Sequence, residues 1–349
     1  MQKQNPFNIN FGKEPYSIIS RRNELQSIVD SFSSEDPNSN VYILTGTRGS
    51  GKTVAMTNIK KHFEELDDWI CVEINPEMDM LEQLASKLYD EGKMKKLFMT
   101  TEFSFSFKGI GLSIKGKEPI QSVSSLLKRE FEHLRKKEKR VLITVDEAVS
   151  NSYMKVFAHE YQTLLRDKFN VCLLMTGLYK NISILQKEKS LTFLYRAPKI
   201  YLYELNSRAI VNSYMNIFEI REKESIELAK FTKGYAYAYQ LLGNILYESG
   251  KKAIDEEVIQ KFDETIQACA YDIIYYELSE REKEIIKCAC YSETNEYVLK
   301  ETQISKNQLS NYKKELSSKG IIEKRRDAIE FKLPRFKEYV LFIDAYYSE

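Results

Sequence analysis

The chain has 349 residues, of which 43% are hydrophobic, so it can form two or three domains with ordinary apolar cores. Lys and Arg number 52 and Asp and Glu number 51, a balance that excludes a general attraction of the whole surface to nucleic acid or anionic membranes. The N-terminus lacks an apolar signal core, no apolar run could span a bilayer, and the five cysteines show no C-x-x-C spacing, so we expect a cytoplasmic protein with reduced thiols and no membrane partner.

The first segments lead into an apolar strand. Residues 1–20 form an arm with aromatic anchors, and the spacing of apolar residues predicts an amphipathic helix over 21–32. A polar linker over 33–40 precedes the strand that begins at Val41.

A glycine-rich stretch follows this strand and fits the phosphate-binding pattern G-x-x-x-x-G-K-[ST] at every fixed position. A helical pattern over 53–66 follows it, which is the context that the motif requires. Glycines let the backbone approach a ligand, and the loop amides and the helix N-terminus attract phosphate. We therefore expect ATP to bind at Gly46, Thr47, Arg48, Gly49, Ser50, Gly51, Lys52, Thr53 and Val54.

Four side chains are candidates for the chemistry at this loop. Lys52 is expected to reach the β- and γ-phosphates, and the Thr53 hydroxyl to ligate Mg²⁺. The buried strand predicted over 140–147 ends in two carboxylates. Asp146 is placed to hold the Mg²⁺ water shell, and Glu147 to orient and polarise the attacking water as a general base.

Two further residues are candidates for contacting the γ-phosphate. Thr176 ends the next predicted strand, so its hydroxyl would face the phosphate, although a Thr before Gly also suits a strand end. Arg196 lies just before the last predicted strand and is the candidate arginine finger for a neighbouring subunit in a homo-oligomer; the alternative is a surface Arg in a loop.

Strands that are nearly all apolar alternate with helices up to residue 205. This pattern predicts an α/β fold in which a parallel sheet is covered on both faces, and we assign 1–205 to a P-loop nucleotide-binding domain. Residues 103–115 alternate with period two around Gly109–Gly111, which predicts a β-hairpin insertion. The hairpin could cover an edge of the core or contact a partner or DNA.

The remainder of the chain is predicted to be mainly helical. Helical patterns predict a lid domain over 206–277. Over 278–349, helices near 280–291, 295–301 and 306–319 are followed by two short strands and a last helix, which predicts a winged helix-turn-helix.

This last domain offers residues suited to DNA grooves and phosphates within 305–326. They are Lys306, Asn307, Gln308, Asn311, Lys313, Lys314, Lys324, Arg325 and Arg326. The same domain also carries many glutamates, so docking of a protein partner is the alternative to DNA binding.

The motifs together resemble the AAA+ ATPases of the origin-recognition group and the related prokaryotic and STAND-like ATPases. The resemblance rests on Gly46–Thr53, on Asp146 with Glu147, on Thr176 and Arg196, and on the lid and winged helix that follow. The segment Ile19–Leu25 is similar to the arginine-glutamate box of the family, which lies near the adenine. The resemblance implies an ATPase that assembles according to its nucleotide state.

The chain also departs from the family pattern. Members often carry Asn where Thr176 stands, and Tyr237 occupies the place of the lid arginine. The missing arginine predicts slow hydrolysis. Our leading interpretation is an ATP-dependent oligomeric switch on DNA. The alternatives are a STAND-like signalling or defence switch that acts through a protein partner, and a transcription regulator gated by nucleotide.

Overall fold

The computed structural model describes residues 4–9, 15–90, 103–107, 112–114, 118–119, 122–188 and 191–347. They divide into two compact units. Unit 1 comprises the described parts of Met1–Arg21, Gly46–Gly51 and Leu202–Glu349, and unit 2 comprises those of Arg22–Thr45 and Lys52–Tyr201. The predicted boundaries of the three domains at 205/206 and 277/278 stay a prediction.

Unit 2 is built on a parallel sheet. Within the described residues, five strands lie in the order β2-β6-β7-β1-β8. Their bounds are β2 Trp69–Glu73, β6 Arg140–Val145, β7 Val171–Gly177, β1 Val41–Thr45 and β8 Lys199–Tyr201. Each neighbouring pair is parallel, so the expected α/β parallel sheet of a P-loop NTPase is confirmed. Because all strands run the same way, their carboxyl ends share one edge.

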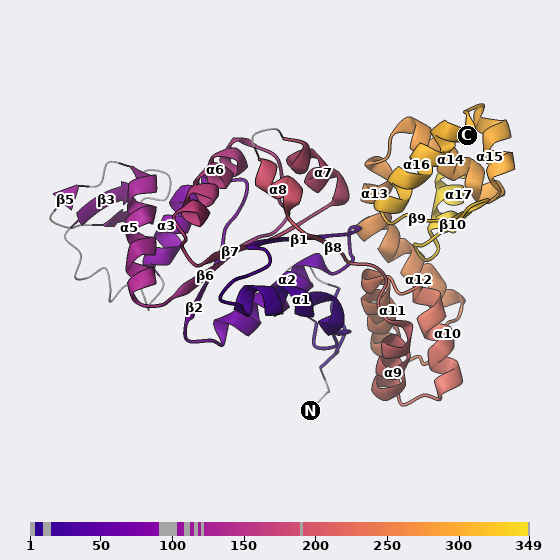
Figure 1. The fold of residues 1–349 in the computed structure, drawn as a ribbon. Helices are drawn as coiled ribbons and strands as arrows, with labels where there is room; N and C mark the ends of the chain where they lie inside the picture. The colour runs from indigo at the N-terminus through magenta and orange to yellow at the C-terminus, as the bar shows by residue number, and fades with distance from the viewer. Residues whose placement is uncertain are drawn as a thin grey trace. The chain divides into compact units, whose positions relative to one another are not determined.

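Helices cover both faces of this sheet (Figure 1). On one face lie α1 (Arg22–Ser33) and α2 (Lys52–Glu64), where Phe32, Tyr42 and Phe63 make ring contacts. The other face packs against α3 (Met80–Asp90), α5 (Val123–Lys136) and α6 (Ser152–Arg166). Because of this two-sided coverage, β1 and β7 are buried along their whole length.

Two short helices and a small sheet complete unit 2. The helices α7 (Tyr179–Lys187) and α8 (Thr192–Arg196) lie between β7 and β8. The strands β3 (Phe103–Phe107) and β4 (Leu112–Ile114) pair antiparallel, and β5 (Glu118–Pro119) pairs parallel with β3. The predicted hairpin turn at Gly109–Gly111 lies outside the described residues.

Unit 1 is mainly helical. Its first helices are α9 (Ser207–Phe218), α10 (Glu222–Thr232), α11 (Ala236–Ser249) and α12 (Glu256–Ile266). The last of these helices is not uniform: α12 passes into the π-helical turn η1 (Gln267–Tyr271) and then into α13 (Asp272–Tyr276). The N-terminal arm joins this core, because Phe7 is buried against Tyr214, Phe218 and Tyr239.

The last elements follow in the expected order. They are α14 (Glu280–Tyr291), α15 (Asn295–Thr302), α16 (Lys306–Ser318), β9 (Ile322–Lys324), β10 (Ile329–Phe331) and α17 (Phe336–Tyr347). The strands β9 and β10 pair antiparallel. Their identity as a winged helix-turn-helix stays a prediction. We call Glu280–Tyr347 the C-terminal module.

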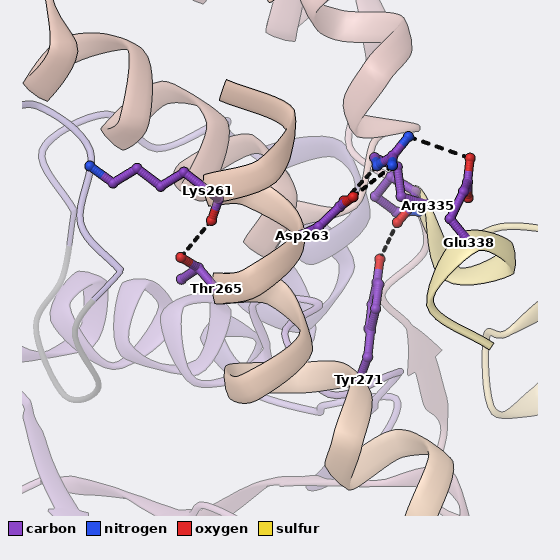
Figure 2. Close-up of polar contacts among 7 residues, drawn as sticks. Lys261, Asp263, Thr265, Tyr271, Arg335 and Glu338 are labelled. Carbon is purple, nitrogen blue, oxygen red and sulfur yellow. Dashed lines mark hydrogen bonds and ion pairs between the residues drawn. The ribbon is translucent and has the colours of Figure 1, made fainter. Parts of the chain in front are cut away.

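A polar cross-link joins α12 to the segment before α17 (Figure 2). The Arg335 guanidinium donates to both carboxylate oxygens of Asp263, at 2.5 and 2.6 Å, and the Tyr271 hydroxyl donates to the carbonyl of Pro334. Such bidentate pairs are directional, so the link fixes how the C-terminal module meets the preceding helices. Among the residues described, no helix has the length and apolarity that crossing a membrane requires.

Candidate functional site

The phosphate loop runs from the end of β1 to the start of α2. Gly49 and Gly51 have φ angles of 73° and 87°, which side chains disfavour, so the glycines are needed for the path of the loop. Lys52 and Thr53 are the first residues of α2, and Val54 follows half-buried in the same turn. The helix N-terminus therefore begins where the motif expects the phosphates to lie.

A polar cluster in unit 2 is centred on Asp146, which follows β6. The Thr53 hydroxyl donates to Oδ2 of Asp146 at 2.8 Å, and the Thr176 hydroxyl donates to Oδ1. The register of the sheet explains the second contact, because Val145 pairs with Met175 and the next residues are therefore neighbours. Three of the predicted site residues are thus brought together.

The backbone of Glu147 is held in an uncommon conformation at this edge. Its φ is 52°, in the left-handed region, which non-glycine residues adopt mainly where the surroundings enforce it. Its N–H lies 3.0 Å from Oδ1 of Asp146 and 3.2 Å from the Thr176 hydroxyl. The Ala148 N–H donates to the Thr176 carbonyl at 2.8 Å. The turn presents the Glu147 carboxylate to solvent.

The donor set of this cluster fits a hard divalent cation. Thr53 and Asp146 offer hydroxyl and carboxylate oxygens, the ligands that Mg²⁺ takes from proteins together with phosphate oxygens. Within the ranges that the structure describes, no group of three or more His, Cys, Asp or Glu side chains could hold a metal ion.

Arg196 lies elsewhere in unit 2. It is the last residue of the short helix α8 and not part of a loop, as the alternative to an arginine finger supposed, and its side chain is exposed. The preceding Tyr195 is 73% exposed. In the described part of the chain, the Arg196 side chain makes no hydrogen bond or ion pair, and the structure does not bring it to the Asp146 cluster.

Within unit 1, residues far from the phosphate loop in the sequence contact its carbonyl groups, which the sequence did not predict. The Tyr235 hydroxyl donates to the Arg48 carbonyl at 2.6 Å, and the Tyr237 N–H donates to the Gly49 carbonyl at 3.1 Å. The Arg21 guanidinium donates to the Ser50 carbonyl at 3.2 Å. The sequence had marked Tyr237 only for the missing arginine.

The C-terminal module also contacts the loop within unit 1. The Thr47 hydroxyl donates to the Lys319 carbonyl at 2.9 Å. Gly320 has a φ of 74°, and a Cβ there would lie 1.8 Å from the Thr47 hydroxyl oxygen. The Arg48 guanidinium lies 3.9 Å from a carboxylate oxygen of Glu277. Gly320 is required in the turn after α16, because any side chain at this position would collide with Thr47.

The predicted DNA-contacting residues of the C-terminal module differ in their exposure to solvent. The exposed group comprises Lys306, Asn307, Gln308, Asn311, Lys314 and Arg326. The expectation is wrong for Lys313, which is 3% exposed and donates to Asn295 Oδ1 and to the carbonyls of Arg325 and Ala328. Arg325 is exposed but forms ion pairs with Glu323 and Glu330. The Lys324 side chain lies outside the description.

Comparisons with known proteins reveal a shared fold. No protein-family model and no curated protein sequence matches the chain. The Walker-type ATPase PABY2304 of Pyrococcus abyssi aligns with a TM-score of 0.65 and 16% identity, over 95% of this chain and 99% of that chain. Cdc6p from Pyrobaculum aerophilum aligns with a TM-score of 0.49 and 16% identity over 97% and 96%. ORC2 of Aeropyrum pernix aligns with a TM-score of 0.48 and 16% identity, over 98% of this chain and 98% of that chain. The first likeness shows that the chain shares its fold with a Walker-type ATPase, as the predicted parallel sheet of a P-loop NTPase implied.

Proposed function

We propose that the chain is a molecular switch that binds ATP with Mg²⁺ and hydrolyses it slowly to ADP and phosphate. The observation that carries the proposal is the 2.8 Å hydrogen bond between Thr53 and Asp146. It joins the residue after the loop lysine to the carboxylate at the end of β6, the two oxygen donors that P-loop NTPases use around Mg²⁺. The fold shared with a Walker-type ATPase supports the same proposal.

Each residue then has a role that follows from its chemistry. Gly46–Val54 would bind the phosphates through main-chain amides, and Lys52 would offset the charge of the β- and γ-phosphates. Thr53 and Asp146 would hold Mg²⁺, which neutralises phosphate charge when bound. Glu147, whose carboxylate faces solvent, would orient the attacking water.

The proposal includes assembly and a macromolecular partner. An exposed Arg196 suits donation to the nucleotide site of a second copy, as an arginine finger requires. Exposed Lys306, Lys314 and Arg326 suit contacts with DNA phosphates. DNA is therefore our first candidate for the partner.

A protein partner is the second candidate, because the C-terminal module also exposes aromatic side chains. Tyr291, Phe342 and Tyr346 are 60%, 57% and 69% exposed, and the last two stack. Exposed aromatic side chains of this kind are enriched at protein interfaces. In this case the chain would act as a nucleotide-controlled signalling switch.

Equilibrium binding of ATP with Mg²⁺ is the first test of this function. Lys52→Ala should remove tight binding, and Glu147→Gln should retain ATP but stop turnover. Unchanged affinity in the Lys52 variant would refute the phosphate-loop assignment, and retained turnover in the Glu147 variant would mean that another residue orients the water.

Light scattering of the Glu147→Gln variant, with and without ATP, Mg²⁺ and a DNA duplex, then tests assembly. A larger species that forms with ATP and takes up DNA supports the switch on DNA, and Arg196→Ala should prevent it. A monomer that ignores DNA under all conditions refutes assembly on DNA.

A further inference from the structure

The contacts on the outer side of the phosphate loop concern consecutive peptide groups. The carbonyls of Arg48, Gly49 and Ser50 all accept hydrogen bonds from unit 1. Their donors differ in kind: a phenol hydroxyl, a main-chain N–H and a guanidinium group. Without these three donors, the carbonyl groups would form hydrogen bonds with water.

Holding a carbonyl also fixes the direction of an amide. A trans peptide is planar, and its C=O and N–H point in opposite directions. When the Arg48 carbonyl is bound to Tyr235, the N–H of Gly49 is directed to the other side of the loop. The same holds for Gly51 when the Ser50 carbonyl is bound to Arg21. Amides directed inward in this manner form the nest that receives phosphate oxygens.

Tyr235 is itself well fixed. Its side chain is only 6% exposed, and burial raises the pKa of its hydroxyl, which therefore stays a donor over the physiological range. It follows Gly234, whose φ is 72° and whose carbonyl accepts from the Leu205 N–H at 2.8 Å. Gly49 fits against it, since a Cβ at Gly49 would lie 2.4 Å from the hydroxyl oxygen. The contact therefore depends on Gly234, which fixes the position of Tyr235, and on Gly49, which leaves room for its hydroxyl.

We propose that Tyr235 is a positioning residue for nucleotide phosphates. Together with Arg21, it holds the carbonyls of Arg48 and Ser50, so that the N–H groups of Gly49 and Gly51 are oriented before the ligand arrives. The Ser50 N–H between them donates instead to the Thr47 carbonyl at 3.1 Å. Preorganisation of this kind lowers the cost of binding, because the loop need not be ordered by the ligand. The inference rests on the proposed function, since it specifies how unit 1 assists the same ATP site in the absence of a lid arginine.

The test compares two buried tyrosines of unit 1. Tyr235→Phe removes the hydroxyl that contacts the loop, whereas Tyr214→Phe removes a hydroxyl that donates to the Tyr239 carbonyl. We expect Tyr235→Phe to weaken binding of ATP, ADP and inorganic pyrophosphate about 2- to 10-fold, the change expected for one hydrogen bond. We expect Tyr214→Phe to bind these ligands like the unmodified chain. Adenosine, which has no phosphate, should bind both variants equally.

The outcomes separate this inference from the function on which it rests. Equal affinity of Tyr235→Phe and the unmodified chain for pyrophosphate overturns the positioning role. So does a loss that adenosine shares, because that result indicates general unfolding. If Tyr235→Phe does not fold, Arg21→Gln, which removes the contact to Ser50, should show the same loss confined to phosphate ligands. Failure of the unmodified chain to bind ATP would instead overturn the proposed function.

Discussion

Asp146 shows how a single carboxylate can be held by its surroundings before any ligand binds. Thr53 and Thr176 donate to its two oxygens, and the main-chain N–H of Glu147 donates to one of them. Hydrogen bonds to an ionised carboxylate are among the stronger ones in proteins. Thr176 therefore does more than end a strand: it orients both acidic residues of the site.

Thr176→Val tests this arrangement at the scale of one hydroxyl. The variant keeps the shape of the side chain but loses the donor to Asp146 and the acceptor for the Glu147 N–H. We expect Mg²⁺-dependent ATP turnover to fall roughly 10- to 100-fold, as when a residue that orients a metal ligand is removed. ATP affinity in EDTA should not change. Thr176→Ser is the control, and wild-type turnover in the Val variant would contradict the prediction.

Glu130 is a second residue whose environment is unusual. It is fully buried on α5, and neither carboxylate oxygen has a hydrogen-bond partner. Burial raises the pKa of this carboxyl well above its ordinary value. The stabilising effect of the proton is complete below the unfolded-state pKa of about 4.3 and is lost as the pH rises through the folded-state pKa.

We therefore expect Glu130→Leu to increase the free energy of unfolding by about 1–3 kcal/mol at pH 8, the cost of an unpaired buried polar group. The gain should be smaller at pH 5, where the native carboxyl is closer to neutral. Denaturant unfolding at both pH values measures the difference. Glu132→Leu, on the same helix but partly exposed, is the control. A gain at pH 5 equal to that at pH 8 would argue against the raised pKa.

At the scale of elements, α16 combines a structural lysine with an exposed one. Lys313 ties the helix to the segment that joins β9 and β10, through the carbonyls of Arg325 and Ala328, and to Asn295. Lys314 is the next residue and is exposed. A lysine on a helix expected to contact DNA can therefore serve the fold instead of the ligand.

The pair allows a direct comparison. Lys313→Met should destabilise the chain by about 2–4 kcal/mol, because it leaves buried acceptors unpaired. Lys314→Met should leave stability unchanged but weaken DNA binding and reduce its salt dependence. Thermal unfolding and a salt titration of DNA affinity measure the two effects. Equal thermal midpoints for the two variants would contradict the structural role of Lys313.

At the scale of the whole molecule, the phosphate loop and the C-terminal module belong to one unit and touch at Thr47 and Gly320. If ATP binding alters this contact, then the contact must alter ATP binding to the same extent. Gly320→Ala would place a Cβ against the Thr47 hydroxyl and displace the turn after α16. We expect ATP affinity to fall about 3- to 10-fold, because the loop loses one support.

Gly250→Ala is the matched control for this prediction. Gly250 has a φ of 68°, so alanine brings similar backbone strain, but a Cβ there would meet nothing within 4 Å. Both variants should therefore lose stability, and only Gly320→Ala should lose ATP affinity. An equal effect of the two on ATP binding would show that strain, and not the contact with Thr47, is responsible.

Much of this fold could be predicted from the sequence because its signals are local. The apolar strands, the phosphate loop and the helix α9 are encoded in short stretches. The burial of Lys313 also had a local signal, since Leu309 and Leu316 lie four residues before it and three after it, on one helical face. The helix α8 is too short to show a period.

The contacts around the loop could not be predicted in this way. Thr47 and Lys319 are 272 residues apart, and Tyr235 is 187 residues from Arg48. Such contacts depend on how complete elements pack, and neither a spacing nor a composition reveals them. The motif thus identifies where phosphate should bind, but not which distant groups shape that place.

The position of Phe7 has a consequence for the order in which the chain acquires its structure during synthesis. This side chain fills a space in α11 so closely that a Cβ on Gly243 would lie 2.4 Å from its ring, and the Asn8 N–H bonds to Gln240, 232 residues away. All of the described strands of unit 2 are translated before residue 240 leaves the ribosome, and domains generally fold in the order of their synthesis. We therefore expect the N-terminal arm to bind to α11 only after unit 2 has formed. The contact between residues 8 and 240 closes a long chain loop and is a late folding step.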